Sequence, residues 1–269
     1  MKVIFLDLDG TLNNDRKQIT PRTMDILMRA QSKGTRIALA SARPSPGLFK
    51  ERDILDLQHN NGILMSYNGG RIVDACSNEV LFESAMDLSQ TVSVLRMLEN
   101  FPVTPILDDG VQFYVTDKKG YKVEYECNNN NMVCSEVGNL ADFVNFQPVK
   151  ILMSVEPLII SGIKTQIARL LPDNLTVVQT APFYLEIIPS VINKGQGLLD
   201  TCRAIHVDPK DTIAFGDAEN DIPMLRAASV GVAMGNASDP VKAAADAVTF
   251  SNNEDGIAVW LETHYPAIF

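Results

Sequence analysis

The fold of this chain follows from the stretch VIFLDLDGT at residues 3–11. Its first four residues are apolar and predict a strand buried on both faces, after which Gly10 lets the backbone turn sharply. Asp7 and Asp9 lie two residues apart at the end of this strand, so we expect their side chains to project in similar directions. Open α/β sheets bind ligands beyond the carboxyl ends of their strands, and these acids occupy such a position.

Strands and helices alternate on both sides of the middle of the chain. Thr20 and Pro21 predict the start of a helix that Gly34 ends, and residues 36–40 predict the next strand. Near the C-terminus, residues 212–215 and 230–233 predict strands that flank a helix. Such alternation implies right-handed crossovers, a parallel sheet and a Rossmann-like α/β core.

The middle of the chain has a different pattern. Strand-like runs such as residues 104–107 and 111–116 alternate with helical spacing, which predicts an α+β module. We therefore expect a discontinuous core domain formed by residues 1–81 and 189–269. Residues 82–188 are expected to form an inserted α+β domain, with Asp108, Asp109 and Glu186 on turns.

The composition excludes several classes of function. The 269 residues include 23 Lys and Arg against 33 Asp and Glu, a formal net charge of −10. A chain this acidic lacks the basic surface that binds nucleic acid or an anionic membrane. Its four cysteines have no metal-ligand spacing, and no apolar run approaches the roughly 18 residues of a membrane span. We expect a cytoplasmic monomer or small homo-oligomer without nucleic-acid or membrane partners.

A second acidic cluster, GDAEND at residues 216–221, also follows an apolar strand. Pro223 indicates that a helix begins at once, with Asp221 as its N-cap. Asp217 and Asp221 are therefore expected at the same sheet edge as the two N-terminal acids. Oxygen ligands without histidine or cysteine favour magnesium, although solvated turn residues would produce the same pattern.

Two further elements complete a possible phosphate site. Ser41-Ala42-Arg43 follows the strand at 36–40, where a hydroxyl and backbone N–H groups can hold a phosphate oxygen. Lys194 is expected in the first turn of a helix, where its charge opposes the helix dipole and hints at function. Viewed in isolation, Lys194 is typical of a solvated surface lysine.

Together these residues suit phosphoryl transfer to a carboxylate. A carboxylate can attack phosphorus and form an aspartyl phosphate, provided that the charges of the two anions are neutralised. Magnesium, Lys194 and Ser41 would supply that neutralisation, and the second carboxylate would move the protons. Spacing alone does not say whether Asp7 or Asp9 attacks.

The order of these motifs resembles the haloacid dehalogenase-like superfamily. Residues 7–11, Ser41, Lys194 and residues 216–221 are similar to its first, second, third and fourth motifs. The segment between Ser41 and Lys194 looks like the large α/β cap of the Cof-type phosphatases. We expect this cap, residues 82–188, to choose the substrate, with Asp108, Asp109 and Glu186 as candidates, because the core motifs contact only phosphate and metal. The chain departs from the Thr-Gly-Arg of many relatives at the second motif, where it reads Ser41-Ala42-Arg43.

The resemblance implies a role for each residue. Asp7 would be the nucleophile and a Mg2+ ligand, and Asp9 the general acid/base whose backbone carbonyl also reaches the metal. Asp217 would be a further ligand, and Asp221 would support the metal shell. The phosphoryl group would be held by the side chains of Ser41, Lys194 and Asn220 and by the backbone of Leu8 and Ala42. Arg43 would contact substrate or pair with a cap carboxylate.

These roles predict a magnesium-dependent phosphatase of small phosphorylated metabolites, most simply sugar phosphates. A phosphomutase or phosphotransferase would use the same intermediate with a sugar hydroxyl as acceptor. A receiver-type signalling module would also carry a phosphorylated Asp, a metal and a Lys. Such a module has no need of a lid of roughly one hundred residues, and Asp9 would shorten the lifetime of its phosphorylated state.

Overall fold

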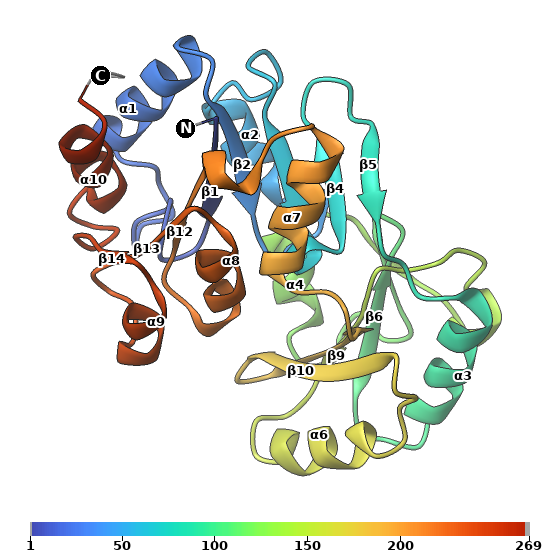
Figure 1. The fold of residues 1–269 in the computed structure, drawn as a ribbon. Coiled ribbons are helices and arrows are strands. Elements are labelled where there is room, and N and C mark those ends of the chain that lie inside the picture. The colour runs from blue at the N-terminus through green and yellow to red at the C-terminus, as the bar shows by residue number, and fades with distance from the viewer. Residues whose placement is uncertain (1, 267–269) are drawn as a thin grey trace. The chain divides into compact units, whose positions relative to one another are not determined.

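The computed structural model describes residues 2–266, which divide into two compact units (Figure 1). Unit 1 is formed by both ends of the chain, up to Glu83 and from Asn193 onward, and unit 2 is formed by Ser84–Ile192. Unit 1 has a mainly parallel sheet with helices on both faces, and unit 2 has a mainly antiparallel sheet. The predicted fold class, a Rossmann-like α/β core with an inserted α+β cap, is confirmed.

The sheet of unit 1 places β1 at its centre. Its strands are β1 (Val3–Asp7), β2 (Arg36–Ala40), β3 (Ile63–Ser66), β4 (Arg71–Asp74), β5 (Val80–Glu83), β12 (Thr212–Gly216), β13 (Val230–Ala233) and β14 (Ala247–Val248). They lie in the order β14-β13-β12-β1-β2-β3-β4-β5, parallel from β14 to β3 and antiparallel beyond. Because β1 pairs with both β2 and β12, the carboxyl ends of these three strands meet at one edge.

Helices cover both faces of this sheet. They are α1 (Pro21–Ser32), α2 (Phe49–Ile54), α7 (Lys194–Ala204), α8 (Ile222–Ala227), α9 (Asp239–Ala244) and α10 (Gly256–His264), with short 3-10 turns η1 (Ser45–Leu48), η2 (Tyr67–Gly69), η3 (Pro209–Asp211) and η4 (Glu219–Asp221). The first helix begins as its sequence predicts: the Thr20 hydroxyl accepts a hydrogen bond from the Thr23 N–H, and Pro21 follows it.

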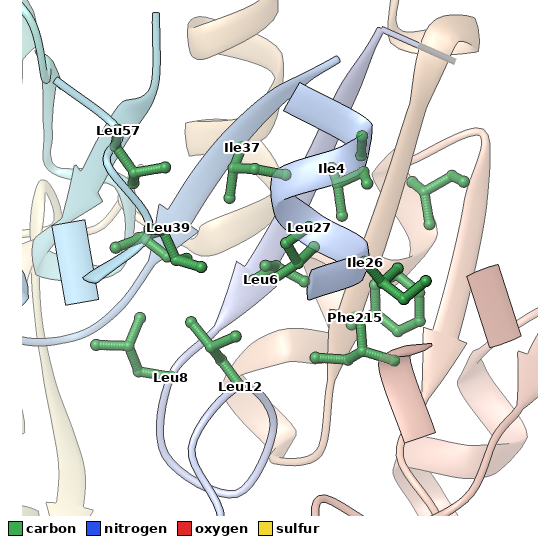
Figure 2. Packing of buried hydrophobic residues seen from close by; sticks show 14 of the residues in the cluster. Ile4, Leu6, Leu8, Leu12, Ile26, Leu27, Ile37, Leu39, Leu57 and Phe215 are labelled. Atoms are coloured by element: carbon green, nitrogen blue, oxygen red, sulfur yellow. The ribbon is translucent and has the colours of Figure 1, made fainter. Parts of the chain in front are cut away.

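Alternate residues of β1 enter different cores, as the period of a strand requires. Ile4 and Leu6 pack with residues of α1 and α10, and Figure 2 shows them beside Ile26 and Leu27 of α1. Val3 and Phe5, which alternate with them along the strand, pack on the other face with residues of α7 and α8. Burying one such side chain contributes about 1.5–3 kcal/mol. The strand that carries Asp7 is therefore held firmly from both sides.

Unit 2 is built around a second sheet. Its strands are β6 (Thr104–Asp108), β7 (Phe113–Val115), β8 (Cys134–Glu136), β9 (Ile151–Ser154), β10 (Leu175–Ala181) and β11 (Tyr184–Pro189), in the order β10-β11-β9-β6-β7-β8. Its helices are α3 (Leu88–Leu98), α4 (Val123–Asn129), α5 (Leu140–Phe143) and α6 (Ile160–Ala168). The core between the sheet and α3, α5 and α6 lies on one face, and α4 packs on the other. Between residues 2 and 266 no helix has both the length and the apolar character needed to cross a membrane.

Candidate active site

Three carboxylates meet where β1 and β12 end. Asp7 is the last residue of β1, Asp217 follows β12, and Asp221 ends the 3-10 turn η4. Each offers an oxygen atom, and these three atoms lie within 4.8 Å of one another. The neighbouring parallel strands therefore bring together acids from the two ends of the chain.

Lys194 lies at the centre of this cluster. It is the first residue of α7, whose N-cap Asn193 accepts a hydrogen bond from the Gln196 N–H. The Lys194 Nζ donates to Asp7 Oδ1 at 2.5 Å and to Asp221 Oδ1 at 2.6 Å. The side chain is 0% exposed, so the interpretation of Lys194 as a solvated surface residue is wrong. The two carboxylates compensate its charge inside the protein.

Asp221 anchors the loop that carries Asp217. Its Oδ2 accepts hydrogen bonds from the backbone N–H groups of Asp217 and Ala218, each at 3.0 Å. Asp221 occupies the predicted N-cap position of α8, but its side chain makes no capping hydrogen bond to that helix. Since Asp221 points back toward the loop and Lys194, its carboxylate fixes the site rather than the helix.

Asp217 is held by two residues to which the sequence interpretation gave no role of their own, Thr11 and Asn236. The Thr11 Oγ1 donates to Asp217 Oδ1 at 3.0 Å, and the Asn236 Nδ2 donates to Asp217 Oδ2 at 3.3 Å. Gly10 passes so close that a Cβ there would lie 2.3 Å from Asp217 Oδ2, and its φ is +89°. No residue other than glycine fits this position without moving Asp217.

The cluster suits a divalent cation. Burial, with the nearby charge of Asp221 adding to it, raises the pKa of Asp7 to about 8 even though Lys194 opposes the shift. Burial alone would lower the pKa of Lys194, but Asp221 and Asp7 outweigh it and raise that pKa. When ionised, the three carboxylates and one ammonium leave two negative charges uncompensated, which matches Mg2+. The oxygen-only donor set also fits that ion.

We expect the pH dependence of stability to report the proton on Asp7. The raised pKa means that the folded protein holds this proton when the unfolded chain, with an ordinary value near 4, has released it. The stabilising contribution is complete below pH ~4 and is lost as pH rises through about 8, with a slope up to about 1.4 kcal/mol per pH unit. Thermal unfolding in EDTA from pH 5.5 to 8.5 measures this loss.

The matched control for this measurement is Asp7→Asn, which removes the titrating group. Its melting temperature should fall less over the same pH range than that of the unaltered protein. Adding saturating Mg2+ should raise the melting temperature of the unaltered protein more at pH 8.5 than at pH 5.5, because ligand carboxylates must be deprotonated. Parallel pH curves for the two proteins in EDTA would contradict the assignment.

Asp9 does not join the three-carboxylate cluster, so the expectation that four acids meet is wrong. Its Oδ1 accepts a hydrogen bond from Lys17 Nζ at 2.5 Å and its Oδ2 from Arg43 Nη2 at 2.6 Å. Burial alone would raise the pKa of Asp9, but the charges of Arg43 and Lys17 outweigh it and hold that pKa below its ordinary value. Arg43 thus pairs with an acid of unit 1.

The remaining predicted phosphate residues lie on neighbouring loops of unit 1. Ser41 follows β2 and is buried, and its Oγ accepts a hydrogen bond from the Arg43 N–H at 3.2 Å. Asn220 belongs to η4, and its Nδ2 donates to Asn68 Oδ1 at 3.1 Å. Leu8 is buried in the core shown in Figure 2, and Ala42 adjoins Ser41.

Unit 2 contains the three residues predicted as candidates for choosing the substrate. Glu186 lies within strand β11 rather than on a turn, is 4% exposed and accepts a hydrogen bond from Lys150 Nζ at 2.6 Å. Asp108 ends β6 and is also buried, whereas Asp109 accepts a hydrogen bond from the Tyr114 hydroxyl at 2.7 Å. Glu186 therefore forms a buried ion pair, and its expected place on a turn is wrong.

Known proteins are similar to this chain over nearly its whole length. The family model described as haloacid dehalogenase-like hydrolase matches residues 4–261. A Streptococcus pyogenes serotype M6 protein that bears a provisional phosphatase name is 29% identical over 269 residues, covering 96% of each chain. A Bacillus subtilis protein named 5-amino-6-(5-phospho-D-ribitylamino)uracil phosphatase YitU is 28% identical and covers 98% of this chain and 97% of its own.

The fold comparison points the same way. The crystal structure of a haloacid dehalogenase-like hydrolase from Bacteroides thetaiotaomicron superposes with a TM-score of 0.92 at 31% identity, covering 98% of this chain and 99% of that one. The chain belongs to the haloacid dehalogenase-like hydrolase family. The relatives named above connect it with the phosphatases of that family.

Proposed function

We propose that this protein is a magnesium-dependent phosphatase that hydrolyses small phosphorylated metabolites, of the sugar or polyol phosphate class, through an aspartyl phosphate on Asp7. The observation that carries the proposal is the Asp7 carboxylate held by a fully buried Lys194 beside Asp217 and Asp221. Three clustered acids, two of them paired with a buried lysine, at the ligand edge of an α/β sheet support a functional site.

The reaction runs in two displacements. An Asp7 oxygen forms a bond to phosphorus while the bond from phosphorus to the ester oxygen breaks, and Asp9 gives a proton to the leaving alkoxide. Asp9 then takes a proton from water, which attacks the phosphorus of the acyl phosphate and releases inorganic phosphate and Asp7.

Several groups hold the transferring phosphoryl oxygens: the side chains of Ser41, Lys194 and Asn220 and the backbone N–H groups of Leu8 and Ala42. Their positions follow from the ends of β1 and β2, the first turn of α7 and the turn η4. Preorganised donors of this kind stabilise the charge that develops in the transition state.

The cation would be held by the carboxylates of Asp7 and Asp217 and by the Asp9 backbone carbonyl, with Asp221 fixing the Asp217 loop. Bound Mg2+ supplies charge neutralisation between the carboxylate and the phosphate. Arg43 and Lys17 hold Asp9 ionised before substrate arrives. For the first displacement Asp9 must take up a proton from water, and we expect this when Arg43 and Lys17 turn from Asp9 to the anionic substrate, with Arg43 as a substrate contact.

The substrate class rests on a relative and on the inserted unit. The name of the Bacillus subtilis protein describes a phosphate ester of a ribityl chain, which is a polyol. The residues that we place in the site contact phosphate and cation, so the leaving group is expected to be chosen by the cap, unit 2. A screen of phosphorylated metabolites with and without Mg2+ tests this. Release of inorganic phosphate from polyol phosphates is expected, whereas transfer to a sugar hydroxyl without release would identify a phosphotransferase.

Asp217→Ala is expected to raise the Mg2+ concentration needed for half-maximal activity at least about tenfold, the equivalent of ~1.4 kcal/mol of binding. The physical reason is the loss of one oxygen ligand from a cluster held within 4.8 Å. Mg2+-induced thermal stabilisation should weaken in parallel, which gives a measurement independent of catalysis.

Asp25→Ala is the matched control for this variant. Asp25 lies on α1 and pairs only with the exposed Arg29, at 2.9 Å, among the salt bridges of the described chain. This control should retain the Mg2+ requirement of the unaltered protein. An unchanged requirement in Asp217→Ala would show that the assigned ligand is wrong.

A further inference from the structure

The turn after β3 has an unusual backbone. Tyr67 and Asn68, consecutive residues of η2, have φ values of +52° and +56°. Left-handed conformations are uncommon for residues with a side chain, and especially so for a bulky one. Both residues are also buried, at 2% and 8% exposure. Strain of this kind costs of order 1 kcal/mol or more per residue and persists where the surrounding structure enforces it.

Three hydrogen bonds connect this turn with the proposed phosphate-binding segments. The Asn68 N–H donates to the Ser41 carbonyl at 2.8 Å, and the Tyr67 N–H donates to the Arg43 carbonyl at 3.0 Å. The side chain of Asn68 accepts from Asn220 Nδ2 at 3.1 Å. One turn thus binds the loop after β2 through its backbone and the loop after β12 through a side chain.

The same turn touches the helix that begins with Lys194. Gly69 has a φ of +94°, and a Cβ there would lie 2.7 Å from the Gly197 Cα and 3.0 Å from the Asn193 carbonyl oxygen. The turn therefore packs directly against the first turn of α7. The turn η2 therefore contacts the segments that carry Ser41, Asn220 and Lys194.

We propose that Asn68 is a positioning residue for phosphoryl transfer, which fixes the amide of Asn220 toward the phosphoryl group. The inference rests on the proposed function. The amide of Asn220 has two N–H bonds. With one of them bound to Asn68 Oδ1, the amide plane is oriented and its other N–H remains to serve the substrate. Asn220 is exposed, so packing does not fix its side chain. The hydrogen bond to Asn68 fixes it instead.

Asn68→Gly isolates this role, because glycine keeps the left-handed backbone and removes only the side chain. With p-nitrophenyl phosphate and Mg2+ as probe, kcat/KM is expected to fall about five- to tenfold. Asn78→Gly is the matched control. Asn78 also has a left-handed backbone in unit 1, with φ +58°, but it lies in the β4–β5 turn. This control should keep the kcat/KM of the unaltered protein.

A double-mutant cycle with Asn220→Ala separates positioning from a general effect on the fold. If Asn68 acts through Asn220, Asn68→Gly should lower kcat/KM by less than twofold once Asn220 is alanine. An equal loss in both backgrounds, or no loss in the Asn68→Gly variant, would overturn the proposal.

The side-chain amide signals of Asn220 in 15N–1H NMR spectra give a readout that needs no catalysis. In Asn68→Gly they should move toward the values of a solvent-exposed amide, while Asn78→Gly leaves them in place. Unmoved signals would overturn the positioning role. If the unaltered protein hydrolysed no phosphate ester, the phosphatase proposal would fail, and these signals would still decide whether Asn68 fixes Asn220.

Discussion

Asp7→Asn is expected to fold and to hydrolyse phosphate esters at least about a thousandfold more slowly than the unaltered protein. The amide has nearly the shape of the carboxylate, but it cannot form the acyl phosphate. Steady-state kinetics measure the loss of kcat. Mass spectrometry of the acid-quenched protein should find one added phosphoryl group on the unaltered chain and none on the variant.

The fold of Asp7→Asn should remain intact because the change relieves charge in a buried site. Burial and Asp221 raise the pKa of the Asp7 carboxyl to about 8, so a neutral group there is readily accommodated. Asp25→Asn on the exposed face of α1 serves as the control for an equivalent change elsewhere. Turnover within tenfold of normal in Asp7→Asn would remove Asp7 as the nucleophile.

Lys194→Met is expected to lose both activity and stability. Methionine preserves much of the volume of a fully buried side chain but removes the charge that contacts Asp7 and Asp221. Breaking a buried ion pair by removing one partner costs about 3–5 kcal/mol. The kcat/KM for a phosphate ester should fall on the order of a thousandfold, because a donor to the transferring phosphoryl group is lost.

Denaturant unfolding of Lys194→Met in EDTA should show a larger loss at pH 8.5 than at pH 5.5, because Asp7 can take up a proton at the lower pH. Lys2→Met, which changes a lysine paired with Asp211 on the surface, is the control and should shift the unfolding midpoint little. If Lys194→Met were as stable as the unaltered protein at pH 8.5, a group other than Lys194 would compensate the buried charges of Asp7 and Asp221, and the prediction would be wrong.

Much of the fold could be predicted from local patterns. The apolar run before Asp7 and the Thr20-Pro21 helix start are strong signals, because strand burial and helix capping depend on neighbouring residues. The alternation of strands and helices predicts a parallel sheet, but it does not predict that β1 lies between β2 and β12. The order of strands depends on contacts between distant segments, which a short window of sequence does not contain.

The sequence predicts the clustering of Asp7 and Asp217 because these acids lie at or directly after the end of a strand. Asn68 and Asn236 lie two and three residues beyond β3 and β13, and the sequence analysis gives them no role. The burial of Lys194 could not be predicted from the sequence, because it depends on the tertiary packing of α7, which shields the side chain from solvent. The Asp9 carboxylate lies outside the cluster of acids because it pairs with Lys17 and Arg43 instead.

The interruption of unit 1 by residues 84–192 has a consequence for how the protein is made. Asp7 leaves the ribosome before the insertion is made, whereas Lys194, Asp217 and Asp221 emerge only after the whole insertion. In a nascent chain Asp7 therefore lacks its ion-pair partner until Lys194 of α7 has been made. Chains truncated anywhere before Asp221 lack the assembled cluster, so the cluster forms only after the insertion and β12 have been synthesised.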